Sequence, residues 1–211
     1  MIPGPEEYYK CPKCGQISYR GSLVSGNTFG AILYSDGKQI SPMLPDFPSI
    51  NKCKNCDTFY WLTEENEIKE YNFPNEFKQK NNEKVEKAEF LTINEYQEAI
   101  DIKFHKNEKE HKHLRINLWW TYNNRFRNNE NMEFSEDEYK MFELNCLELK
   151  NILNKDHENE NIMLAEINRN IGNFSECTSI INTFEEKFSW IKEVLEKECI
   201  KNNKKVVVIR Q

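Results

Sequence analysis

Two Cys-x-x-Cys pairs constrain this chain more than any other feature of its sequence. The pairs are Cys11/Cys14 and Cys53/Cys56, and each is followed by a residue, Gly or Asp, that tolerates the left-handed backbone of a tight turn. Four thiolates at about 2.3 Å from one ion form a closed tetrahedral zinc site with no position left for water. The sequence therefore predicts one structural Zn²⁺ ion bound by these four cysteines.

The 38 residues from 15 to 52 form an unusually long connection between the two pairs. The entropic cost of closing a loop grows only by about 0.6 kcal/mol per doubling of its length. Binding of a structural zinc ion contributes on the order of 10 kcal/mol to folding, so the long loop is tolerable. An iron site of the rubredoxin type uses the same ligands and remains an alternative.

Cysteine usage and charge indicate where such a chain works. The other three of the seven cysteines, Cys146, Cys177 and Cys199, stand alone in helical patterns, so metal binding in a reducing compartment fits better than disulfides. A net charge of −6 disfavours a protein that coats nucleic acid or an anionic membrane. No apolar run of about 18 residues and no signal-peptide pattern is present. We expect a cytoplasmic protein without a membrane partner.

Residues 1–74 have the pattern of a small β-rich zinc-ribbon module. Asp36-Gly37 supplies a tight hairpin turn between residues 28–34 and 38–40, because both positions accept positive φ angles. Thr58–Leu62 is rich in aromatic residues and predicts a strand that leaves the second cysteine pair.

Beyond this module the pattern becomes helical. Residues 75–90 read as a charged linker or lead-in, and residues 91–211 as a helical bundle. Capping boxes begin helices at Thr92 and Ser135. The remaining elements expected are a central buried helix over 106–127, three shorter helices near 161–171, 175–187 and 189–201, and a β-type run at 206–209. The predicted fold class is α+β: a zinc-ribbon module followed by an all-α helical-hairpin bundle.

Basic residues near the cysteines admit two interpretations. A tetrathiolate zinc centre carries a formal charge of −2, which nearby lysines would offset, and this reading is favoured. The same residues on one face could instead bind nucleic acid, although the acidic balance of the chain opposes it. The residues concerned are Lys10, Lys13, Arg20, Lys52 and Lys54.

Two further regions carry weaker signals. Trp119, Trp120 and Arg125 could stack bases or grip a partner, but core tryptophans beside internally paired arginines are the more common arrangement. The 25–37 hairpin gathers polar groups that an enzyme could use, although a well-formed turn explains them better. These groups are Asn27, Thr28, Tyr34 and Asp36. No nucleotide-binding, nucleophile-elbow or zinc-protease motif occurs, so no catalytic residue is predicted.

Two stretches resemble known families. Residues 163–177 resemble one tetratricopeptide unit, with Gly172, Phe174 and Cys177 at its turn glycine, aromatic and small positions. The resemblance implies a helical hairpin, about 161–187, that packs on neighbours and can present a peptide-binding groove. The segments 25–31, 34–37 and 42–45 and the second cysteine pair resemble uncharacterised bacterial zinc-ribbon proteins with helical C-terminal parts. That resemblance implies the architecture and the zinc ligands, and no activity.

Three functional hypotheses follow from these observations. The leading one is a non-enzymatic protein-interaction or adaptor protein with a structural four-cysteine zinc site and a protein partner. The first alternative is a nucleic-acid-binding zinc ribbon. The second is an enzyme of unknown class with its site on the 25–37 hairpin.

Overall fold

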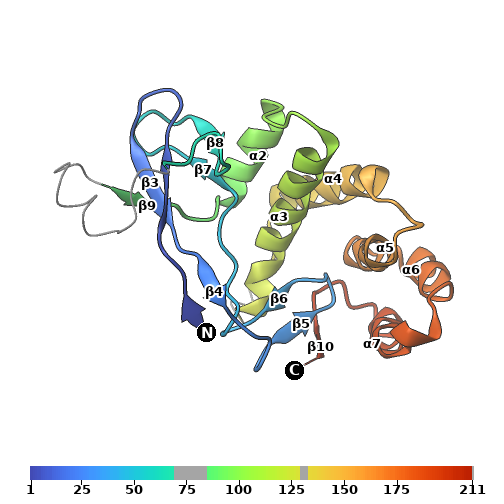
Figure 1. Ribbon diagram of the computed structural model, residues 1–211. Coiled ribbons are helices and arrows are strands. Elements are labelled where there is room, and N and C mark those ends of the chain that lie inside the picture. The colour runs from blue at the N-terminus through green and yellow to red at the C-terminus, as the bar shows by residue number, and fades with distance from the viewer. Residues whose placement is uncertain (69–84, 129–132, 211) are drawn as a thin grey trace. The chain divides into compact units, whose positions relative to one another are not determined.

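The computed structural model describes residues 1–68, 85–128 and 133–210 (Figure 1). The chain divides into two compact units. A β unit comprises Met1–Gly30 and Ser41–Ala99, and a helical unit comprises Ala31–Ile40 and Ile100–Gln211. Strands dominate the first unit and helices the second, so the predicted α+β class is confirmed. Residues 75–84 of the expected linker lie outside the described residues.

Short strands and the helix α2 build the described part of the β unit. β2 pairs antiparallel with β3, and β9 adds to β3 in parallel. β1 pairs with β4 and β7 with β8, both antiparallel. The helix α2 begins after Thr92, whose amide donates to Glu95 and whose hydroxyl accepts from the Glu95 amide, as the predicted capping box requires. The bounds are β1 (Ile2–Pro3), β2 (Glu7–Lys10), β3 (Ile17–Arg20), β4 (Leu23–Ser25), β7 (Ile50–Lys52), β8 (Phe59–Trp61), β9 (Glu86–Lys87) and α2 (Ile93–Asp101).

The helical unit contains five α-helices and a three-stranded sheet in the part of the chain that the structure describes. The predicted capping box at Ser135 is present, with reciprocal bonds to Glu138. The sheet has the order β10–β5–β6 and is antiparallel, so the C-terminal run pairs with the hairpin at 32–40 (Figure 1). The bounds are β5 (Ile32–Tyr34), β6 (Gln39–Ile40), α3 (Glu108–Arg127), α4 (Glu136–Ile152), α5 (Glu158–Asn170), α6 (Phe174–Ile181), the 3-10 helix η1 (Glu186–Phe188), α7 (Ser189–Ile200) and β10 (Val208–Arg210).

A helical hairpin is formed by α5 and α6. Gly172 has φ = 89° and stands where α5 ends. Its amide donates to the carbonyl of Arg169, and the Asn173 amide donates to that of Asn168, which is the paired bonding of a glycine-terminated helix. The apolar faces of α5, α6 and α7 then meet in one core that includes Ala165, Cys177, Ile181, Leu195 and Cys199.

The helical unit differs in two details from the sequence-based expectation. The segment Ala31–Ile40 belongs to this unit, although sequence position assigned it to the zinc-ribbon module. The second helix of the hairpin ends at Ile181 and not near 187. The amides of Thr183 and Phe184 bond back three residues, which tightens the chain into a turn before η1.

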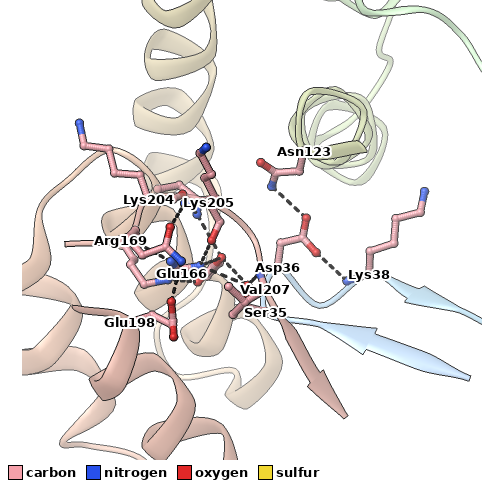
Figure 2. A network of polar contacts seen from close by, with 12 residues as sticks. Ser35, Asp36, Lys38, Asn123, Glu166, Arg169, Glu198, Lys204, Lys205 and Val207 are labelled. Atoms are coloured by element: carbon pink, nitrogen blue, oxygen red, sulfur yellow. Dashed lines mark hydrogen bonds and ion pairs between the residues drawn. The ribbon is translucent and has the colours of Figure 1, made fainter. Parts of the chain in front are cut away.

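Four buried polar side chains at the end of α5, which we call the polar clamp, join three segments of the helical unit. The clamp consists of Ser35, Glu166, Arg169 and Asn170, all at most 1% exposed. Spacings of three and four residues place its α5 members on one helical face. Glu166 accepts from Arg169 at 2.5 and 2.8 Å and from Ser35 at 2.7 Å (Figure 2). It also accepts from Asn170 at 3.0 Å.

The polar clamp holds the C-terminal segment through its backbone. Arg169 donates to the carbonyls of residues 203 and 205, the latter at 2.9 Å, and Asn170 donates to that of residue 204 at 2.9 Å. The Ser35 hydroxyl accepts from the amide of Val207 at 3.0 Å. Because buried backbone groups need partners, these bonds let a segment without regular structure lie against the buried end of α5, while its residues Lys204 and Lys205 are exposed.

The clamp gives a testable prediction about stability. Glu166→Gln leaves the buried charge of Arg169 without a counter-ion, which should lower the free energy of unfolding of the helical unit by about 3–5 kcal/mol. Urea denaturation followed by helical circular dichroism measures this. The matched control is Glu148→Gln, since Glu148 is 48% exposed and lies 3.8 Å from Arg115, and its loss should stay within about 1 kcal/mol. Equal losses in the two variants would contradict the role given to the clamp.

Candidate metal centre

The turn of the β2–β3 hairpin presents the first cysteine pair. The Cys11 amide donates to the carbonyl of Gln16 at 2.9 Å, which closes the hairpin across the turn. The Gly15 amide donates to the Cys11 carbonyl at 3.0 Å, and Gly15 has φ = 77°. This left-handed residue reverses the chain directly after Cys14, as its identity predicts.

The turn of the β7–β8 hairpin presents the second pair with the same bonding pattern. The Cys53 amide donates to the carbonyl of Thr58 at 2.9 Å, and the Asp57 amide donates to that of Cys53 at 2.8 Å. Asp57 has φ = 56°, and it is one of the few non-glycine residue types that adopt this conformation readily. The two hairpins are therefore equivalent knuckles, each aiming two sulfur atoms from its turn.

The structure brings the four sulfur atoms into one cluster. All lie within 4.8 Å of one another, with Cys11 Sγ 3.7 Å from Cys56 Sγ and Cys14 Sγ 3.5 Å from Cys53 Sγ. A tetrahedron with metal–sulfur bonds of about 2.3 Å has edges of about 3.8 Å, so the spacing suits a tetrahedral metal ion. None of the four cysteines forms a disulfide. Among the described residues, this is the only group of His, Cys, Asp or Glu side chains close enough to bind a metal.

Each knuckle contributes one buried and one more accessible thiol. Cys11 and Cys53 are 2% exposed. Burial raises the pKa of the Cys11 thiol, and it raises the pKa of Cys53 to about 12. A hydrogen bond from the Asn55 side chain, with a second from the Gln16 amide, lowers the pKa of the exposed Cys14 to about 6. A metal ion must displace protons from the buried pair, so its affinity falls on acidification.

Aromatic and aliphatic side chains cover the inner side of the cluster. Tyr9, Tyr60 and Leu62 are buried beside Cys11 and Cys53 in one core. The Tyr60 hydroxyl is held by Ser18 at 2.7 Å and Asn51 at 2.9 Å. The four thiols could fill the four positions around a tetrahedral ion, and apolar side chains back the buried pair.

Three of the five basic residues considered for nucleic-acid binding form ion pairs within the β unit. Lys52 lies 2.7 Å from Glu98, Lys54 3.3 Å from Glu89, and Arg20 2.7 Å from Glu7. Each carboxylate offsets a positive charge that would otherwise attract a phosphate. The face is consequently less basic than the positions of its lysines and arginine imply.

The region of the two tryptophans is part of the interior. Trp119 is completely buried and donates to Asn170 at 2.9 Å, and Trp120 donates to the carbonyl of Asp36 at 3.0 Å. Arg125 pairs with Glu138 at 3.0 Å. These contacts agree with the interpretation of core tryptophans and an internally paired arginine.

The polar residues of the 25–37 hairpin do not form one group. Asn27 and Thr28 are exposed residues of the β unit, and Asn27 accepts from the Phe29 amide at 2.9 Å. Tyr34 and Asp36 are buried in the helical unit. The Asp36 carboxylate accepts from Asn123 at 2.9 Å and forms an ion pair with Arg127, a buried side chain 1% exposed. Asp36 thus has a structural partner on each side.

Sequence reasoning missed the polar clamp. Its three α5 members lie in the stretch that the sequence predicts as a helical hairpin, and Ser35 lies in the 25–37 hairpin. The available signal was the run of Glu, Asn, Arg and Asn at 166 and 168–170, in which 166, 169 and 170 share one helical face, an unusual density of polar residues for a packed helix.

Comparisons with protein-family profiles, curated proteins and solved structures found no match to this chain. In the described part of the chain, no helix has the length and apolar character needed to cross a membrane.

The metal centre predicts a fixed metal content. The purified chain should carry one metal ion, and Cys53→Ser should lose it, because one of the two buried ligands is removed. Elemental analysis by mass spectrometry measures the ratio of metal to protein. Cys146→Ser, which removes a buried thiol from α4 in the other unit, should keep the ion. Retention of metal by Cys53→Ser would exclude the four-sulfur site.

Proposed function

We propose that the four cysteines bind one structural zinc ion that keeps the β unit folded, and that the helical unit binds a segment of a partner protein. Zinc suits a closed tetrahedral thiolate site, and we favour it over iron. The resemblance to bacterial zinc-ribbon proteins supports the same ion.

Small strands explain why the β unit would need a metal ion. Its strands have two to four residues, and an isolated hairpin of that size is at best marginally stable in water. A zinc ion would cross-link the β2–β3 hairpin to the β7–β8 hairpin. The free energy of that bond, on the order of 10 kcal/mol, is comparable with the stability of a whole small domain.

One observation carries the proposal of protein binding: a groove of about 630 Å³ on the α5–α6 hairpin. We call it the hairpin groove. Its floor is apolar and its rim is charged, which is the composition of surfaces that hold a protein segment. The apolar residues that line it are Ile162, Leu164, Ile180, Phe184 and Phe188.

The charges of the hairpin groove favour a basic partner segment. Four carboxylates line it, against the two ammonium groups of Lys150 and Lys155, and Lys187 pairs with two of the carboxylates, those of Glu158 and Glu185. One negative charge is left over. Lys150 is engaged with Asn168 at 2.6 Å. The carboxylates are those of Asp156, Glu158, Glu176 and Glu185. A segment with apolar side chains flanked by Lys or Arg would complement both the floor and the rim.

Two further features support binding over catalysis. The hairpin resembles one tetratricopeptide unit, and such units present peptide-binding surfaces. Three buried charged groups of the helical unit are engaged within it: Asp36 accepts from Asn123, Glu166 accepts from Ser35, and Arg169 donates to the carbonyl of residue 205.

Zinc removal should affect the two units differently. A chelator should speed amide hydrogen exchange in the segments that carry the ligands, residues 8–17 and 50–60, because the hairpins lose their cross-link. Amides of α5 to α7, whose core contains no ligand, should keep their protection. Hydrogen exchange with mass spectrometry measures both. Unchanged exchange around the cysteines after the metal has left would contradict a structural role.

Site-specific cross-linking tests the partner site. A photo-cross-linking amino acid in place of Ser179, an exposed residue of the hairpin groove, should join one discrete protein in the native host. The same amino acid in place of Lys197, exposed on α7 and outside the groove, is the matched control.

The cross-linked protein should then bind the purified chain directly. Phe184→Glu, which places a charge on the groove floor, should weaken that binding at least tenfold. Equal labelling from positions 179 and 197, or binding that is indifferent to Phe184→Glu, would contradict the proposed site.

A further inference from the structure

A second cavity, which we call the aromatic pocket, lies in the helical unit away from the hairpin groove. It has a volume of about 360 Å³, within the range of small-molecule sites. Residues from α3, α4, the end of α5 and the C-terminal segment line it. Those used below are Phe126, Phe134, Tyr139, Phe142, Asn170 and Lys204.

The aromatic rings of the pocket fix one another in place. Phe134 stacks on Phe142 with ring centres 4.9 Å apart, and it meets Phe126 at 5.9 Å and Tyr139 at 6.1 Å with a tilted or edge-on ring. The Arg125 guanidinium lies 4.1 Å from the centre of the Phe134 ring. Such mutual contacts keep the aromatic wall of the pocket preformed.

The polar groups of the pocket differ in whether they can still bond to a ligand. Asn170 is fully engaged, since it accepts from Trp119 and donates to Glu166 and to the carbonyl of residue 204. The Lys204 ammonium lies 3.0 Å from the Tyr139 hydroxyl. Within the described ranges, no carboxylate lies within ion-pair distance of Lys204. Among these residues its positive charge has no counter-ion, and its bond is to the neutral Tyr139 hydroxyl.

The other charges limit what that ligand can be. Lys205 and Glu133 both line the pocket and lie 4.0 Å apart, so they largely balance each other. Glu136, in the first turn of α4, would repel additional negative charge. Lys204 and Lys205 already lie over the rings of Tyr139 and Phe126, at 5.1 and 5.6 Å, where a bound cation would otherwise sit. A single negative charge fits, whereas a cation or a multiply charged phosphate does not.

We propose that the aromatic pocket binds a small planar aromatic monoanion, with its ring against Phe134 and Phe142 and its acid group on the Lys204 ammonium. This inference is independent of the hairpin groove and of the metal centre. It gives the helical unit a ligand site beside the C-terminal segment that the polar clamp holds.

Two related dyes test the ring and the charge separately. Anilinonaphthalene sulfonate (ANS) carries one negative charge, and N-phenylnaphthylamine has the same rings without it. Both should bind the full-length wild-type chain saturably with a stoichiometry of one, measured by dye fluorescence. Lys204→Gln should weaken ANS about tenfold, the loss of one charge-assisted bond, and leave the neutral dye unchanged. Lys201→Gln, an exposed lysine outside the pocket, should change neither dye.

A second pair of variants locates the dye. Phe134→Leu should weaken both dyes, while Phe184→Leu in the hairpin groove should weaken neither, with circular dichroism showing that each variant is folded. Three results would each overturn the proposal. They are non-saturable ANS binding, equal loss in Lys204→Gln and Lys201→Gln, and binding that depends on Phe184 and not on Phe134.

Discussion

The convergence of four sulfur atoms from two distant hairpins is the constraint on which the β unit depends. Its sheets contain strands of two to four residues, too short to bury much apolar area or to form long hydrogen-bonded ladders. The cluster sits where the turns of both hairpins meet, and each turn has the same backbone bonds and the same left-handed residue after its second cysteine. A bound ion would convert two marginal hairpins into one domain.

In the helical unit, hydrogen bonds from buried side chains hold a segment that has no regular structure. Its C-terminal segment passes beside α5 before it pairs as β10 with β5, and the polar clamp supplies the hydrogen bonds that this backbone needs. A buried carboxylate, guanidinium, amide and hydroxyl satisfy one another there, so the charge of Arg169 is compensated as well as desolvated. Both proposed ligand sites are lined in part by α5, the helix that carries the clamp. The hairpin groove uses α5 and α6, and the aromatic pocket uses α3 and α4.

Local signals in the sequence predict where helices and turns begin. They do not predict which distant segments pair or bond, because long-range packing determines those contacts. Capping boxes at Thr92 and Ser135 located two helix starts, and Gly172 located the turn between α5 and α6, because these are bonds between near neighbours. The pairing of β10 with β5 and the bond between Ser35 and Glu166 join segments more than 100 residues apart, which periodicity cannot predict. The sequence predicts that α6 continues to about 187, and not to Ile181, because the apolar pattern continues through the turn into Phe184 and Phe188.

X-ray absorption at the zinc edge tests most directly whether four sulfur atoms surround the metal. The account predicts a first shell of four sulfur atoms at about 2.3 Å from zinc in the protein as purified, with no nitrogen or oxygen neighbour. A shell that contains nitrogen or oxygen, or a preparation whose metal is absent or is not held by these four sulfurs, would contradict it.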